Sequence, residues 1–359
     1  MKNKINLLLT LSLPLFILNC STKPVAGSTP TQVQVPPTTT VQQAPRPSLG
    51  RPISETISTT LPSPRSETLQ QSIPSTPAPI VRPTPKYGQS HFSKRFKLPN
   101  SIKETSGLIK LDNRLWTFND SGGKAALYQI NERNGDIVKS ISIQNAKNKD
   151  WEDIAYDDNY VYIADVGNNK GNRKDLKIYK IPRAALRTEK SVKAEVINFN
   201  YSDQKNFTSR PQKHNYDCEA ITVNNGKIYL FSKNWQDNKT RLYELSTQVG
   251  KHTAKHISTF NIQGMVTAAS INKELDILLL TTYSSLLNVN VWAFSNYRAN
   301  DFFSGNRKRL NFKNALQGQV EGITFIDNYK AYMSSEAFSK YIFSFDPTLY
   351  ELDFSGEFE

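Results

Sequence analysis

The stretch DWEDIAYDDNYVYIADVGNN, residues Asp150–Asn169, decides the fold. It has an acidic start, an apolar run, a polar Asp-Asp-Asn turn, a second apolar run and a Gly-Asn-Asn end. Two short β-rich runs that are separated by such a turn predict an antiparallel hairpin. We therefore expect this stretch to be one hairpin of a larger β-sheet unit.

The same pattern occurs at four other places in the chain. The five inner strands are predicted to start at Ser106-Gly107-Leu108, Glu152-Asp153-Ile154, Glu219-Ala220-Ile221, Thr267-Ala268-Ala269 and Glu321-Gly322-Ile323. An apolar second strand follows each of them. A third strand then carries a central aromatic residue, at Tyr128, Tyr179, Tyr243, Trp292 and Phe343. A repeat of about 50 residues made of short strands predicts a radial arrangement of sheets.

Fourth, outer strands are predicted in the first four repeats, at Val138–Ile143, Ala194–Asn200, Ala254–Phe260 and Lys308–Phe312. The fifth repeat lacks one, and the unassigned run Phe92–Leu98 can supply it, which closes the ring without an open sheet edge. The sequence thus predicts an all-β, five-bladed β-propeller. Six blades are the alternative, if Lys205–Asn215 or the C-terminal tail holds a degenerate blade. The segment Ser202–Tyr216 reads as an inserted loop.

The N-terminal part has a different composition. Residues 1–20 combine Lys2 and Lys4 with an apolar run that is too short to span a membrane, and they end at Cys20. This end resembles the lipobox of bacterial lipoproteins, in which the cysteine is acylated, commonly with palmitate; the alternative is an ordinary signal peptide with a chance cysteine. Residues 21–88 are rich in Pro, Thr and Ser and predict a disordered tether. We expect residues 89–359 to form the propeller, anchored in the outer membrane of a Gram-negative bacterium.

Charge and cysteine content restrict the possible partners and the disulfide content, but they do not select one function. The net charge of +13 suits anionic partners, but no basic stripe with interleaved aromatic residues argues for nucleic acid. The chain has only two cysteines, so no disulfide framework is predicted. Cys218 is expected to be a small buried apolar residue. We expect a monomer.

The repeat predicts a cluster of carboxylates. In a propeller blade the start of the first strand lies beside the end of the second, so these positions should surround one mouth of the central channel. The candidate binding residues at this mouth are Asp120, Glu152, Asp165, Glu219, Lys233, Glu321 and Glu336. Loops with cationic or aromatic residues should reach the same mouth, with Lys124, Lys170, Arg173, Lys174, Lys213, His214 and Trp235.

Several carboxylates in a narrow space must share protons, pair with Lys233 or hold a cation. Oxygen ligands favour Ca²⁺ or Mg²⁺, and the candidate ligands are Glu152, Asp165, Glu219 and Glu321. Alternatively, inner-strand acids accept hydrogen bonds from the backbone of the next blade. No nucleophile elbow, phosphate loop or zinc pattern occurs, so catalytic residues are not assigned.

Four segments resemble one group of proteins: WTFNDSGG (Trp116–Gly123), Asp150–Ile181, YDCEAI (Tyr216–Ile221) and YLFSKNW (Tyr229–Trp235). The resemblance covers Lys97–Phe345 and is to exported bacterial propeller lipoproteins with WEDI and DCEAI motifs, common in Bacteroidetes, which are distantly similar to phytase-like and esterase-like propellers. It implies an exported propeller but supplies no reaction.

Three functions remain open. The first is an envelope-anchored protein that binds a protein, a glycan or an anionic small molecule on the carboxylate face. The second is a metal-dependent hydrolase of phosphate esters or lactones. The third is a structural envelope protein. Binding is the first expectation because no complete catalytic set can be identified.

Overall fold

The computed structural model describes residues 82–314, 316, 318–340 and 343–359. The predicted signal segment with Cys20, and the predicted tether up to residue 81, lie outside the described residues. Within the described part, no helix has both the length and the apolar character needed to cross a membrane.

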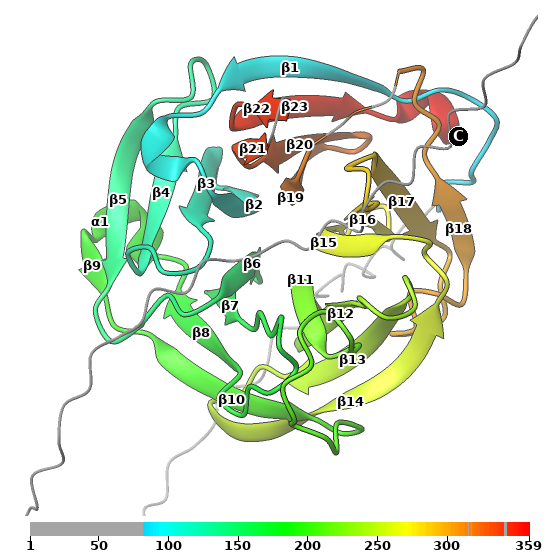
Figure 1. The fold of residues 1–359 in the computed structure, drawn as a ribbon. Helices are drawn as coiled ribbons and strands as arrows, with labels where there is room; N and C mark the ends of the chain where they lie inside the picture. The colour runs from blue at the N-terminus through cyan, green and yellow to red at the C-terminus, as the bar shows by residue number, and fades with distance from the viewer. Residues whose placement is uncertain (1–81, 315, 317, 341–342) are drawn as a thin grey trace, which may run out of the picture. The chain divides into compact units, whose positions relative to one another are not determined.

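The described part of the chain forms five blades of four strands each around a common axis, as the sequence predicts (Figure 1). Blade 1 contains β2 (Thr105–Leu111), β3 (Arg114–Asn119), β4 (Ala126–Ile130) and β5 (Ile137–Ile143). Blade 2 contains β6 (Trp151–Tyr156), β7 (Tyr160–Asp165), β8 (Lys177–Pro182) and β10 (Glu195–Tyr201). Blade 3 contains β11 (Asp217–Asn224), β12 (Lys227–Lys233), β13 (Thr240–Ser246) and β14 (Gly250–Phe260).

The last two blades complete the ring. Blade 4 contains β15 (Met265–Asn272), β16 (Ile277–Tyr283), β17 (Val289–Ser295) and β18 (Asn306–Arg309). Blade 5 contains β19 (Val320–Asp327), β20 (Lys330–Ser335), β23 (Thr348–Asp353) and β1 (His91–Lys97). The shorter elements are β9 (Ser191–Val192), which pairs with β5, the hairpin of β21 (Phe338–Lys340) and β22 (Phe343–Phe345), α1 (Ala185–Thr188) and two 3-10 turns, η1 (Asn100–Ile102) and η2 (Ser355–Glu357).

The N-terminal strand closes the ring, which confirms the predicted closure. β1 pairs antiparallel with β23, with His91 opposite Asp353 and Lys97 opposite Thr348. The buried Glu357 carboxylate strengthens this junction, because it accepts hydrogen bonds from the Ser90 hydroxyl at 2.5 Å and from the Asn311 N–H at 2.7 Å. The two ends of the folded part are therefore joined by a sheet and by a polar contact.

The structure corrects the third strand of blade 5. The sequence predicts this strand at Ile342-Phe343-Ser344, but β23 at Thr348–Asp353 occupies the position, with Tyr350 at its centre. Phe343 belongs instead to the additional hairpin of β21 and β22. Both segments are short and contain an aromatic residue next to a polar one, so the sequence pattern alone could not distinguish them. Residues 205–215 contain no strand, which leaves five blades rather than six.

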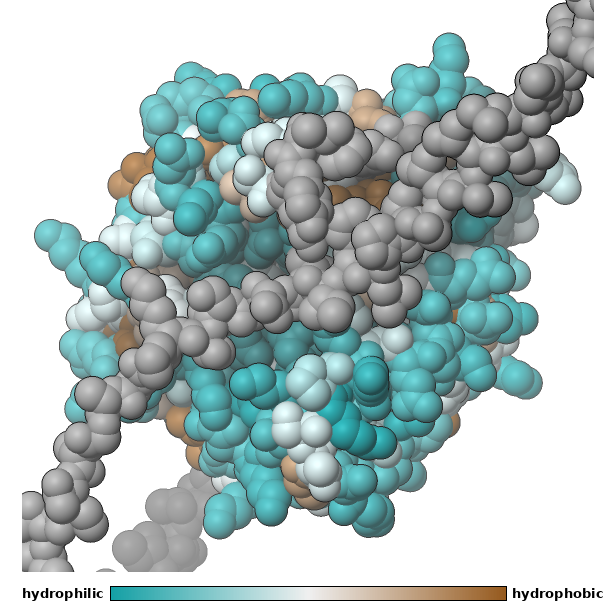
Figure 2. All heavy atoms as spheres, viewed as in Figure 1, coloured by the Kyte–Doolittle hydropathy of each residue, from teal (hydrophilic) through white to brown (hydrophobic). Residues whose placement is uncertain are grey.

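The apolar residues pack between neighbouring blades. Each of five buried clusters joins two adjacent blades; in one of them the Phe118 ring of blade 1 packs edge-on against Trp151 of blade 2, with ring centroids 5.5 Å apart. The face seen in Figure 2 is mainly hydrophilic, with small separate apolar areas. Blades 2 and 3 are also joined at their outer edges, where β10 pairs parallel with β14. Burial between the sheets therefore holds the blades in place.

Candidate functional site

Every inner strand has a β-bulge at the same place. The unpaired residue lies between Ser106 and Leu108 in blade 1, and at the corresponding position of each other blade. The five bulge residues are Gly107, Glu152, Glu219, Thr267 and Glu321. A bulge bends the strand and re-aims a side chain, and bulges are common beside functional sites. In blade 1 the bulge residue is Gly107, one position after Ser106, the residue that the sequence aligned with Glu152 and Glu219.

Three carboxylates meet at this mouth of the channel. Asp120 follows β3, Asp150 precedes β6 and Glu152 is the bulge residue of β6; one oxygen from each lies within 4.8 Å of the others. In the described part of the chain, none of the three forms an ion pair, and Asp120 Oδ1 is buried without a hydrogen-bond partner. We call Asp120, Asp150 and Glu152 the triad.

Gly167, which follows β7, makes room for the triad. A Cβ atom at this position would overlap the Glu152 Oε1 atom and would lie 2.5 Å from Asp150 Oδ2. The Gly167 backbone also contacts the triad segment, because its N–H donates a hydrogen bond to the Asp150 carbonyl at 3.2 Å. Glycine is thus required here by the close approach of two carboxylates rather than by its backbone angles.

Burial and mutual repulsion change the protonation of the triad. Desolvation raises the pKa of Asp120 to about 7, and the nearby Asp150 charge adds to this effect. Burial, together with the Asp217 charge, raises the pKa of Asp150 to about 7. The same causes, burial first and then Asp120, raise the pKa of Glu152 well above its ordinary value. At neutral pH these groups share protons unless a cation replaces them.

Lys233 at the end of β12 is a buried cationic residue at this mouth. Its ammonium group donates to Glu219 and, at 3.0 Å, to the Tyr283 hydroxyl. Burial disfavours the charged form, but Glu219, Tyr283 and Glu321 raise the pKa of Lys233 well above its ordinary value. Glu219 is therefore held in an ion pair, as the sequence allows, and is less available than the triad for a metal ion.

The remaining predicted acids have different surroundings. Asp165 forms an ion pair with Arg173 at 2.8 Å, and this arginine also donates to the Gly167 carbonyl. Glu321 hydrogen-bonds with Tyr283, and burial raises its pKa to about 7. Glu336 lies beside Glu321, and burial followed by that charge raises its pKa well above its ordinary value. Glu152 thus has its nearest carboxylate partners in Asp120 and Asp150, and the Glu219 charge also contributes to its raised pKa.

The sequence did not identify Asp150 of the triad as a site residue, nor two buried acids that shape the site, Asp217 and Asp153. Asp217 accepts the Asn168 N–H at 2.5 Å and the Trp235 indole N–H at 2.7 Å, so it fixes the loop after β7. Asp153 accepts the backbone N–H groups of Ile221 at 2.8 Å and of Ala269 at 3.3 Å. Asp153 therefore fits the alternative prediction, in which an inner-strand acid accepts hydrogen bonds from the backbone of the next blade. Both belong to the WEDI and DCEAI motifs, but nothing in the local sequence separates them from Glu152 and Glu219.

Several predicted loop residues have structural partners. The His214 ring contacts the Asn169 carbonyl and the Tyr216 N–H, and Trp235 lies 4.9 Å from the Lys233 ammonium. The inserted loop Ser202–Tyr216 binds the loop after β7 through the Arg210 N–H and the Lys170 carbonyl at 2.8 Å. Cys218 is buried, and burial raises the pKa of its thiol to about 12, which excludes a reactive thiolate at neutral pH.

Comparisons with known proteins assign no family. No protein-family profile and no curated protein sequence matches the chain. Among solved structures, it is similar to a gluconolactonase from Xanthomonas campestris, with 9% identity and a TM-score of 0.40 over 79% of this chain and 99% of that one. It is also similar to hydrazine synthase from Kuenenia stuttgartiensis, with 9% identity and a TM-score of 0.34 over 66% of this chain. A chain of the mitotic checkpoint complex gives 9% identity and a TM-score of 0.32 over 64% of this chain.

The chain spans less than two thirds of the last two proteins, covering 57% of the hydrazine synthase chain and 60% of the checkpoint chain. At these identities and TM-scores, none of the three similarities assigns a substrate or a reaction. What the structure itself shows is a five-bladed propeller with a partly buried group of carboxylates at one mouth of its channel.

Proposed function

We propose that this protein is an envelope-anchored propeller that binds a divalent cation at Asp120, Asp150 and Glu152 and, through it, an anionic group of a protein or glycan partner. The observation that carries the proposal is the convergence of three carboxylates within 4.8 Å without an ion pair in the described residues. Their oxygen ligands suit Ca²⁺ or Mg²⁺. Such a cation would offset two negative charges of the triad and would leave coordination positions for a ligand.

The triad provides three protein ligands, fewer than the six to eight oxygens that Ca²⁺ takes. Water or a ligand carboxylate or phosphate would supply the others. Lys233 interacts electrostatically with Asp120 and Asp150, but its ammonium group is paired with Glu219, so the bound cation would be the main positive charge that an anionic ligand meets. This combination favours an anionic partner over a neutral one at this mouth.

Isothermal titration of the purified full-length protein with CaCl₂ and with MgCl₂ tests the cation site. We expect one ion per chain, with binding lost in Glu152→Gln and retained in Glu189→Gln, which removes an exposed carboxylate on the rim of blade 2. Binding that is equal in both variants, or absent in the parent, would contradict the proposal and would favour a structural role in the envelope.

A second candidate function is the hydrolysis of phosphate esters or lactones. The observation that favours it is the Lys233 ammonium, hydrogen-bonded to Tyr283 beside the triad. A bound cation would lower the pKa of a water molecule, and Lys233 would stabilise negative charge that develops on the substrate. Turnover of p-nitrophenyl phosphate or of a γ-lactone, lost in both Glu152→Gln and Lys233→Met, would support hydrolysis; no turnover with calcium or magnesium present would exclude these substrates.

The anchoring part of the proposal rests on the lipobox-like end at Cys20 and on the export signal that precedes it. Acylation at Cys20 would hold the propeller at a membrane through the Pro-rich segment, and Ser21 is compatible with sorting to the outer membrane.

A further inference from the structure

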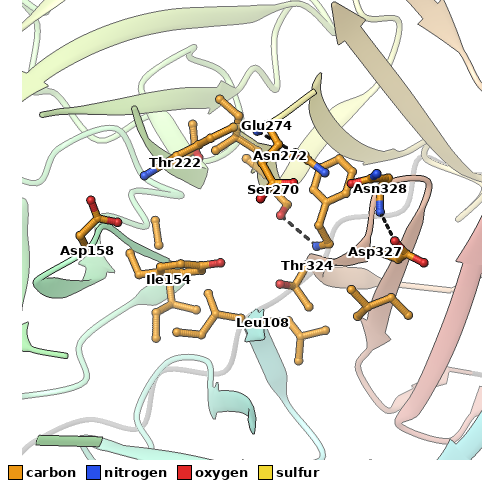
Figure 3. Close-up of a pocket in the computed structure, with 18 residues that line it drawn as sticks. Leu108, Ile154, Asp158, Thr222, Ser270, Asn272, Glu274, Thr324, Asp327 and Asn328 are labelled. Carbon is orange, nitrogen blue, oxygen red and sulfur yellow. Dashed lines mark hydrogen bonds between the residues drawn. The ribbon is translucent and has the colours of Figure 1, made fainter. Parts of the chain in front are cut away.

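The opposite mouth of the channel contains a cavity of about 350 Å³, which lies at the lower end of the range of about 300–1,000 Å³ for small-molecule pockets. Each of the five inner strands contributes to its wall: Leu108 from β2, Ile154 from β6, Thr222 from β11, Ser270 from β15 and Thr324 from β19. Figure 3 shows Leu108 and Ile154 across the open centre from Ser270. The wall is therefore apolar on one side and carries hydroxyl groups on the other.

This cavity is separate from the carboxylate mouth. The Asp153 carboxylate lies between them, because it binds the N–H groups of Ile221 and Ala269, the residues immediately before Thr222 and Ser270. No member of the triad lines the cavity. A ligand here would not contact the proposed cation.

The hydroxyl groups of Thr222, Ser270 and Thr324 can each donate a hydrogen bond to a ligand. Thr324 Oγ1 accepts the Lys110 N–H at 2.9 Å, and Ser270 Oγ accepts the Phe325 N–H at 3.2 Å. Neither hydroxyl donates to a protein acceptor in the described part of the chain, and Thr222 makes no side-chain hydrogen bond there. Three hydroxyl protons are thus available to oxygen acceptors of a ligand.

The rim of the cavity continues outward. A second cavity of about 550 Å³ shares Asp158, Lys273 and Glu274 with the first, so the two adjoin at these residues and extend the site outward as a groove. Asp158 and Glu274 are exposed carboxylates that accept hydrogen bonds, whereas the floor donates them. A ligand with many hydroxyl groups and an apolar C–H face would satisfy the donors, the acceptors and the Leu108–Ile154 side together.

We infer that this mouth binds a neutral oligosaccharide, with its terminal ring on the propeller axis against Leu108 and Ile154 and the following rings along the groove toward Asp158 and Glu274. A sugar ring has hydroxyl groups that donate and accept hydrogen bonds and a C–H face that is apolar. These groups match the hydroxyl donors, the carboxylate acceptors and the apolar side of the cavity. A cationic ligand would meet the exposed carboxylates but would leave the three hydroxyl donors without acceptors, which costs free energy. The site is additional to the proposed cation site and does not depend on it.

Saturation-transfer NMR on the full-length protein, with maltotriose, cellotriose and tri-N-acetylchitotriose as separate probes, tests the inference. We expect at least one of them to bind, more tightly than the corresponding monosaccharide. Thr222→Val keeps the shape of the side chain and removes no protein hydrogen bond, and should weaken the affinity about five-fold, as the loss of one hydrogen bond predicts. Asp158→Asn on the exposed rim provides a second variant whose folding should be unaffected.

Glu152→Gln at the other mouth is the matched control and should bind the sugar as the parent does. The inference is overturned if none of the three sugars binds, or if Thr222→Val and Asp158→Asn both bind as the parent does. It is also overturned if Glu152→Gln alone removes binding, because the sugar would then occupy the carboxylate mouth. Loss of calcium binding with sugar binding retained would reject the proposed cation function and leave this site in place.

Discussion

The Asp153 carboxylate in β6 accepts the backbone N–H of Ile221 in β11 at 2.8 Å, and so joins the inner strands of two neighbouring blades. The same carboxylate binds the N–H groups of Ile154 in its own blade and of Ala269 in blade 4. One side chain thus connects three of the five blades near the axis. Burial raises the pKa of Asp153 well above its ordinary value, although the three N–H groups favour the charged form.

Replacement of Asp153 should destabilise the whole ring. Asp153→Ala would leave three buried N–H groups without an acceptor, and we expect a loss of about 3–5 kcal/mol in the free energy of unfolding. Urea denaturation of the variant and of the parent measures this loss. Glu189→Gln, on the exposed rim, should change the free energy by less than about 0.5 kcal/mol. A comparably small effect of Asp153→Ala would show that the axial hydrogen bonds contribute little.

Substitution of Gly167 should disturb the triad without disturbing the fold. In Gly167→Ala the new methyl group would displace the Glu152 and Asp150 carboxylates, so calcium affinity should fall at least about ten-fold. Gly123→Ala is the matched control, because its methyl group would meet atoms no closer than 3.5 Å and should leave the affinity within about two-fold. Equal affinities in the two variants would place the cation elsewhere.

The raised pKa values of Asp120 and Asp150, both about 7, predict a pH dependence of stability. Between the ordinary aspartate pKa of about 4 and pH 7, the folded state holds protons that the unfolded state releases. In EDTA the melting temperature should therefore fall as the pH rises through this window. Calcium should restore it near pH 8, because the cation replaces the protons, and Asp120→Asn should flatten the pH profile. A melting temperature that rises steadily with pH in EDTA would argue against shared protons.

The closure of the ring should depend on Glu357. This carboxylate is fully buried and pairs with Lys308 at 2.8 Å in addition to its contacts with Ser90 and Asn311. Glu357→Ala should lower the free energy of unfolding by about 3 kcal/mol, since a buried charge partner is lost. The surface pair of Glu351 with Arg95, in the same blade, offers the comparison: Glu351→Gln should cost less than about 1 kcal/mol. Similar midpoints of guanidinium denaturation for both variants would contradict the role of Glu357.

The anchor proposal is tested by Cys20→Ala, which removes the expected acylation site. After expression in a Gram-negative host, the parent should sediment with outer membranes and the variant should appear in the soluble fraction. Cys218→Ala, which removes the other cysteine, should leave the distribution unchanged. Sedimentation of Cys20→Ala with membranes would reject lipidation as the anchor.

The sequence alone determined the repeat and the strand that closes the ring, and it favoured five blades with six as the alternative. These features follow from alternating apolar residues and turn residues, which act over a few positions and are visible without a structure. The same reasoning identified Glu152, Glu219, Glu321 and Lys233 as neighbours at one mouth, because blade geometry places equivalent positions together. It misplaced the third strand of blade 5, where two aromatic segments compete for one position in the sheet.

Only the tertiary structure shows which acids belong to the triad and which ones bind the backbone or form ion pairs. Glu152 and Asp153 are adjacent in the chain, yet the bulge turns one toward the triad and the other toward the backbone of the next blades. Asp165 and Asp217 are also acids near this mouth, but both already have partners. Asp165 forms an ion pair with Arg173, and Asp217 accepts hydrogen bonds from Trp235 and Asn168. The function of a carboxylate depends on partners that arrive from distant segments, and on the space that Gly167 leaves. Local sequence carries the strand pattern, whereas charge, burial and hydrogen-bond partners are set by the closed ring.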